Sequence, residues 1–229
     1  MQEEKKEIIV DFIPFFALFA ASITVLFVYL FAMRGTSPVR ITQACVAPLV
    51  ALVIPVFNRI FGIRIPYAFN IAVAVFAFLA IDGAAVLNLY GLVPHFDKVL
   101  HTSFGVLGGF GVFIFMLYGG GRNLKPWAFF IAVFLGVMGL AALWEIYEYT
   151  ASAITGGNVQ NWKPDLDAVG NMTVKEFFES YNPLWDTIWD MIVAAFGTIF
   201  FFGLILIDKL CGYKVCRRVY EQVCYRRNK

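Results

Sequence analysis

The sequence predicts an all-α protein, a polytopic transmembrane helical bundle of about six spans that forms a single integral membrane domain over residues 1–229. Of the 229 residues, 60% are hydrophobic and only 15% are charged, whereas soluble domains have about 45–50% apolar and about 25% charged residues. One small globule cannot bury this much apolar surface, so lipid is the expected surrounding.

The predicted spans are the segments long enough to cross a bilayer core, which requires about 20 apolar residues of helix. They are residues 8–33, 41–61, 67–90, 94–118, 127–154 and 184–207. Glycine and proline residues separate the first five, as expected for turns. Residues 155–183 form the one long connection, an outer loop, and residues 208–229 form a basic cytoplasmic tail.

The distribution of lysine and arginine predicts the orientation, because cytoplasmic connections are enriched in these residues. With six spans, both termini share a side, and that side carries 13 of the 18 Lys and Arg residues. We therefore expect cytoplasmic N and C termini in a multi-pass protein of the cell membrane. The first apolar run is too long for a cleavable signal peptide and is predicted to be the first span.

Charge and cysteine content exclude some function classes. A net charge of +2 without a basic groove argues against a nucleic-acid partner. The cysteines of the tail do not have the spacing of a zinc ribbon. Two interpretations of them stay open, free thiols in a reducing compartment and reversible lipidation next to the membrane. These cysteines are Cys211, Cys216 and Cys224.

Ionisable residues inside the last three spans are the most informative feature, because a charge in the bilayer is costly. They form three pairs with i,i+3 or i,i+4 spacing, which puts both members on one helix face. The pairs are Asp97 with His101, Glu145 with Glu148, and Asp186 with Asp190. Because successive spans alternate in direction, all three pairs fall in the same outer leaflet.

Small residues continue the same helix faces below the charged pairs. Gly105 and Gly108 follow His101, and Ala194 and Gly197 follow Asp190. On the preceding span the corresponding small residue is Ala141. Small residues allow close approach of helices in membranes, so the charged faces are predicted to point into the bundle.

This composition predicts a divalent-metal site, because five carboxylates and one imidazole cannot remain ionised together without a cation. The predicted ligands are Asp97, His101, Glu145, Glu148, Asp186 and Asp190. Carboxylates with one histidine suit Mn, Mg, Fe or Zn as the cofactor. Two alternatives stay open, a hydrogen-bonded polar network that joins three helices and a proton or cation pathway.

Other polar and aromatic residues are secondary candidates. Asp82, in the third span, is either a further ligand or partner of the site, or a locally hydrogen-bonded carboxyl. His95 is predicted to be a surface residue, and Asp208 to face water at a span end. An interfacial aromatic belt is predicted, formed by Trp144, Trp185 and Trp189.

Three motifs together resemble a known family. They are Phe96 to His101 followed by Gly105, Trp144 to Glu148, and Trp185 to Met191 followed by Gly197. In order and spacing this pattern resembles the YjdF-type family of bacterial inner-membrane proteins, a group of unknown function. The likeness covers about residues 67–207. It implies a multi-span helical bundle and supplies no activity.

The functional hypotheses follow from the residues. The first is a metal-dependent membrane hydrolase acting on a lipid or lipid-linked headgroup at the extracytoplasmic side, since only a lipid shares that depth. Glu148 is then the predicted general base, although it fits equally well as a ligand. The alternatives are a cation- or proton-coupled transporter and a non-catalytic membrane assembly factor with a structural polar cluster. Membrane lipids are the expected partners in each case.

Overall fold

The computed structural model describes residues 2–155, 172–176 and 183–224, and all regular elements in these ranges are helical. Within them, six helices are long and apolar enough to cross a membrane, as predicted. They comprise Ile9–Ala32, Pro38–Phe61, Tyr67–Val86, Phe96–Tyr118, Pro126–Ile154 and Leu184–Leu210. The largest differences from the predicted boundaries are at the third span, which ends four residues early, and at the second and sixth, which are each three residues longer.

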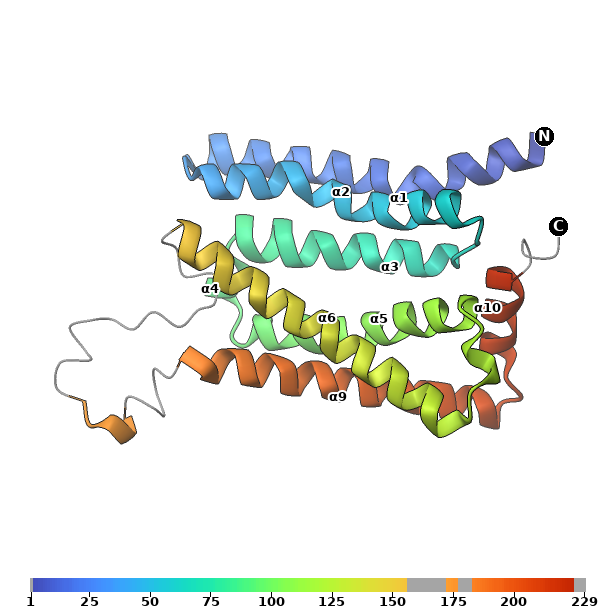
Figure 1. Ribbon diagram of the computed structural model, residues 1–229. Helices are drawn as coiled ribbons and strands as arrows, with labels where there is room; N and C mark the ends of the chain where they lie inside the picture. Colours follow the sequence, from blue (N-terminus) through green and yellow to red (C-terminus); the bar gives the residue numbers. More distant parts are fainter. Residues whose placement is uncertain (1, 156–171, 177–182, 225–229) are drawn as a thin grey trace.

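The first half of the bundle consists of three helices that lie side by side (Figure 1). Helix α1 (Gln2–Phe27) continues into a π-helical turn, η1 (Val28–Ala32), and α2 (Pro38–Phe61) returns antiparallel to it. Helix α3 (Tyr67–Ala77) continues into a longer π-helical segment, η2 (Phe78–Val86). Alanines and a leucine fill the contact between these helices, so their backbones approach closely.

The second half contains α5 (Phe96–Tyr118), α6 (Pro126–Thr155) and α9 (Pro183–Leu210). Helices α5 and α9 share the most extensive contact in the described chain. A core of aromatic rings lies between these helices, and in it the Phe113 ring packs edge-on against Phe129 and Phe201. The short helix α4 (Leu89–Leu92) connects the two halves, and the one-turn 3-10 helix η3 (Gly121–Asn123) connects α5 to α6.

The predicted basic tail begins as structured chain. Helix α9 extends to Leu210, and α10 (Lys214–Cys224) packs against α5 and α9 through buried Val219. The prediction that Asp208 faces water is wrong. Its carboxylate is largely buried and accepts the backbone N–H groups of Val215 at 2.9 Å and Cys216 at 2.8 Å. The first N–H groups of a helix have no acceptor within it, so Asp208 caps α10.

The bundle has two distinct ends (Figure 1). The start of α1, the end of α9 and all of α10 lie at one end, called here the α10 end. Helix α4 and the first turns of α5 and α9 lie at the other, the α4 end. Both ends of the helical chain therefore share a side, as an even number of spans requires. The cytoplasmic placement of that side stays a prediction. Most of the predicted outer loop, 155–183, lies outside the described residues.

Candidate functional site

The site is built on the close contact between α5 and α9. A Cβ atom at Gly105 would collide with the backbone carbonyl of Ala194, and one at Gly197 with the carbonyl of Thr102. Only glycine fits at these two positions, because the opposing atoms belong to backbone. The prediction that small residues close the packing below the charged pairs is confirmed for Gly105 and Gly197. This contact brings the first turns of α5 and α9 together.

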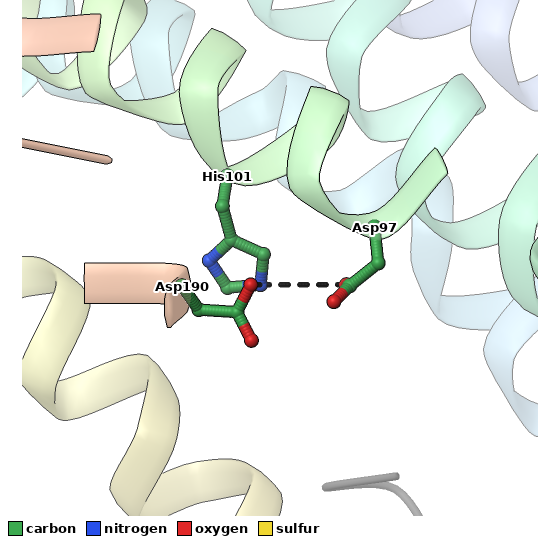
Figure 2. Close-up of side chains that lie close together, drawn as sticks. All are labelled: Asp97, His101 and Asp190. Atoms are coloured by element: carbon green, nitrogen blue, oxygen red, sulfur yellow. Dashed lines mark ion pairs between the residues drawn. The ribbon is translucent and has the colours of Figure 1, made fainter. Parts of the chain in front are cut away.

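Three of the predicted ligands meet at the α4 end. Asp97 and His101 come from α5 and Asp190 from α9, and their side chains point toward one another (Figure 2). The Nε2 atom of His101 lies 3.5 Å from Oδ1 of Asp97 and 3.7 Å from Oδ1 of Asp190. His101 and Asp190 are buried, and Asp97 is partly exposed. Asp190 has one carboxylate oxygen, Oδ2, without a hydrogen-bond partner among the described residues.

Lys98 also lies inside this cluster, although it was not among the predicted site residues. Its ammonium group contacts Asp186 at 2.6 Å, Asp190 at 2.8 Å and Asp97 at 3.1 Å. From the sequence, Lys98 was predicted only to be a charge in an outer connection. The signal that points to it is its place in the first turn of a span, directly after Asp97, where a long flexible side chain reaches a neighbouring helix.

Lys98 changes the electrostatic argument for a metal. The carboxylates were predicted to need a cation, and one positive charge is already present, because the ammonium group of Lys98 lies within the cluster. A divalent ion is therefore not the only source of charge balance there. Asp186 joins the cluster through Lys98. It is not one of the residues whose ligand atoms gather within reach of one ion in the described chain.

The third pair approaches the cluster from α6 without joining that group. Glu145 and Glu148 are buried at 6% and 8% exposure. The indole N–H of Trp144 donates to Oε1 of Glu148 at 2.9 Å, and Thr187 of α9 hydrogen-bonds to Glu145. Glu148 nevertheless interacts electrostatically with Asp97 and Asp190. Glu148 is therefore close enough to Asp97 and Asp190 to affect them electrostatically, but neither glutamate belongs to the group formed by Asp97, His101 and Asp190.

The phenol of Tyr90, on α4, interacts electrostatically with the same acidic groups. Partial burial raises the pKa of Tyr90 above its usual range, and the negative charges of Asp97, Glu148 and Asp190 raise it further. A phenolate is disfavoured next to carboxylates. Tyr90, which was not among the predicted site residues, therefore stays a neutral hydroxyl near the cluster.

Asp82 does not belong to the cluster. It is fully buried in η2, and the hydroxyl of Ser22 on α1 donates to its Oδ2 atom at 2.7 Å. Of the two alternatives left open for Asp82, the structure supports the hydrogen-bonded carboxyl. His95, predicted to be a surface residue, is exposed immediately before α5.

The geometry of Asp97, His101 and Asp190 fits a metal ion. One ligand atom from each lies within 4.8 Å of the other two. Ligands about 2.0–2.2 Å from a tetrahedral ion stand roughly 3.3–3.6 Å apart, close to the two distances that His101 makes. The set combines two carboxylates with an imidazole, a chemistry shared by Zn, Mn and Fe sites. These three residues can hold a metal ion.

The sequence matches the model of one known protein family. Residues 15–209 match the model of a family described as "Predicted membrane protein (DUF2238)". The chain belongs to this family. The match runs from α1 to α9 and includes every residue of the cluster, in agreement with the resemblance to the YjdF-type family. Neither the curated proteins nor the solved structures give a match.

Proposed function

We propose that this protein is a metal-dependent membrane hydrolase that acts on a lipid or lipid-linked headgroup, with Asp97, His101 and Asp190 as the metal ligands. The observation that carries the proposal is that these three residues, from two helices, bring their ligand atoms within 4.8 Å of one another. A metal with three protein ligands keeps a fourth position for water or substrate, which is the arrangement of catalytic zinc sites.

Charge balance supports this choice of ligands. A divalent ion neutralises Asp97 and Asp190, with His101 as a neutral ligand. The positive ion repels the ammonium group of Lys98, which then pairs with Asp186, already its nearest partner at 2.6 Å. In this scheme the ion with Asp97 and Asp190 has no net charge, and neither has the pair of Lys98 with Asp186.

The chemistry follows from the metal and its neighbours. A bound divalent ion lowers the pKa of its water and polarises a phosphoryl or carboxyl oxygen of the substrate. Glu148 is the proposed general base, since it lies beside the ligand group and interacts electrostatically with Asp97 and Asp190. A base acts within hydrogen-bond reach of the water it deprotonates, directly or through one further water.

The position of the cluster favours a lipid substrate. It lies in the first turns of α5 and α9, where each helix enters the apolar part of the bundle. Headgroups of membrane lipids share that depth, whereas a water-soluble substrate would have to enter the interface. The extracytoplasmic side is part of this proposal, based on the lysine and arginine distribution.

The three contacts of Lys98 favour a second candidate, a structural polar cluster that holds α5 and α9 together without metal. In that case the protein is a non-catalytic membrane component. Such a cluster has no use for an open ligand position, and Glu148 has no role in a reaction.

A hydrolysis assay separates the two candidates. Protein purified in detergent is stripped with a chelator, reloaded with Mn²⁺ or Zn²⁺, and tested for phosphate release from a long-chain alkyl phosphate and for ester cleavage of phosphatidylglycerol. We expect turnover that requires metal and falls about 100-fold or more in Glu148→Gln, as for loss of a general base. Asp82→Asn is the matched control and should keep full activity. Metal-independent stability without turnover of either probe would support the structural cluster instead.

A further inference from the structure

A large apolar crevice separates the two halves of the bundle. Its volume is about 880 Å³, near the upper end of the roughly 300–1,000 Å³ typical of ligand pockets. Residues of α2, α3, η2, α5 and α6 line it, and nearly all of them are aliphatic, aromatic or glycine. It exists because α3 and α5, although consecutive spans, touch only slightly along their length.

The crevice ends at the candidate metal site. His101 lines its wall at the α4 end, together with Trp144 and Tyr90. The Trp144 indole donates to Glu148, and the Tyr90 phenol lies in the field of Asp97 and Glu148. Among the residues that line the crevice, His101 is the one with a metal-ligating side chain. The apolar crevice and the polar cluster are therefore continuous at this end.

The length of the crevice distinguishes among hydrocarbon chains. Along α5 it extends from His101 to Met116, which at 1.5 Å per residue is about 22 Å. One leaflet of a bilayer core is about 15 Å thick, half of roughly 30 Å. A chain with its headgroup at His101 can thus continue past the middle of the membrane inside the protein. A long hydrocarbon chain in an extended conformation can fill this length, whereas a short chain leaves the deep part empty.

We propose that the crevice binds one long hydrocarbon chain of a lipid, which passes the middle of the membrane inside the protein, and holds its headgroup against Asp97, His101 and Asp190. This inference rests on the proposed function and names the substrate class of the same site. The chain beyond the midplane then selects the substrate, because each buried CH₂ adds to affinity.

Two glycines give a matched pair of variants. Gly111 lies in the deep part of the crevice, about 15 Å along α5 from His101, and a Cβ there would meet only the ring of Phe69, at 3.4 Å. Gly203 lies on the exposed face of α9, where an added Cβ meets nothing within 4 Å. A phenylalanine at Gly111 fills the deep crevice, whereas one at Gly203 faces the surroundings.

The test compares two probes with the same headgroup, a long-chain polyprenyl phosphate and geranyl phosphate, by native mass spectrometry of the detergent-solubilised protein. The wild type should bind the long chain at least about tenfold more tightly. Gly111→Phe should remove this preference and keep the affinity for geranyl phosphate, whose chain ends before residue 111. Gly203→Phe should bind both probes as the wild type does.

Either of two results overturns the inference: a wild type without preference for the long chain, or a Gly111→Phe variant that retains the preference. Unchanged geranyl phosphate binding is the check that Gly111→Phe is folded. If the Gly111→Phe variant is not folded, Ala132→Phe replaces it, because it introduces the same ring into the deep crevice from α6.

The design separates this inference from the proposed function. If only the crevice inference fails, metal binding and hydrolysis persist without any preference for chain length. If only the proposed function fails, the ratio of the two affinities persists in chelator and no probe is hydrolysed.

Discussion

The two halves of the bundle both bury carboxylates, but in different surroundings. In the first half Asp82 has a single hydroxyl, that of Ser22, as its partner, and its Oδ1 atom has none among the described residues. In the second half an ammonium group, an imidazole and further carboxylates surround Asp190. A buried acid is thus not a site by itself. A site arises where two helices approach closely enough to put opposite charges together.

The sharpest test of this difference is the same substitution in both halves. Gly197→Ala places a Cβ against the carbonyl of Thr102. A Cβ at Gly83 instead meets the flexible end of Leu89 at 3.0 Å and the carbonyl oxygen of Phe78 at an ordinary contact distance of 3.5 Å. We expect about 3 kcal/mol of destabilisation for Gly197→Ala, at the upper end for an overpacked contact, and under about 1 kcal/mol for Gly83→Ala. Thermal unfolding in detergent measures both. Equal losses would mean that the contact between α5 and α9 is no tighter than the packing around η2.

Removal of the positive charge of Lys98 should cause the next largest loss of stability. Lys98→Met leaves Asp97, Asp186 and Asp190 without their ammonium partner. Because Lys98 is partly exposed, we expect a loss of about 2–3 kcal/mol, below the 3–5 kcal/mol typical of a fully buried pair. Added Mn²⁺ should restore much of it, since an ion that binds only the folded state stabilises it. A variant that Mn²⁺ does not stabilise would contradict the proposed exchange of charge between Lys98 and the metal.

The carboxyl of the first half should matter less. Ser22→Ala removes the one hydrogen bond that the structure gives Asp82, and a single such bond contributes about 1 kcal/mol. We expect a loss of that size, independent of added Mn²⁺. A response to metal similar to that of Lys98→Met would place Asp82 in the same electrostatic unit as the cluster and erase the difference between the halves.

The alkylation rate of Cys216 shows whether α10 packs against α5 and α9. This measurement on the wild type requires no destabilising substitution. Burial and the adjacent carboxylate of Asp208 raise the pKa of Cys216 to about 12, and a thiolate is the reactive form. Because the raised pKa keeps the thiol neutral, the alkylation rate of Cys216 at pH 8 should be about 100-fold or more below that of an ordinary thiol. It should rise with pH toward 12.

Exposed Cys211 is the internal reference for this measurement. Asp208→Ala removes both the charge and the cap of α10, and should increase alkylation of Cys216 while Cys211 is unchanged. Equal rates at the two cysteines of the wild type would indicate that α10 is detached from α5 and α9.

The helices of this fold were predictable, and the π-helical segments were not. Apolar length alone locates each span, because a bilayer forces about 20 residues of helix. The largest boundary error is at the third span, where η2 ends at Val86 and Asn88 adopts a positive φ of 64° before α4. Period and composition do not encode that break, since the residues around it remain apolar.

The sequence predicted which helix faces carry the cluster and at which end of the helices it lies. It did not predict which side chains contact one another. The i,i+4 spacing of Asp97 and His101 and the glycines below them correctly predicted a polar cluster between α5 and α9. Which acids share a single point depends on the rotation of each helix, and spacing does not fix it. Spacing therefore does not distinguish Asp97, His101 and Asp190 from the other three predicted ligands. Lys98 was missed because residues were assigned to a helix face by their spacing alone, and the long side chain of a lysine can reach a neighbouring helix from outside that face.

Metal content measured by inductively coupled plasma mass spectrometry tests the central claim most directly, on protein purified in detergent and equilibrated with Mn²⁺ or Zn²⁺. The account predicts about one ion per chain in the wild type and in Asp82→Asn, and almost none in Asp190→Asn. A wild type without bound metal, or the same content in Asp190→Asn as in the wild type, would contradict it.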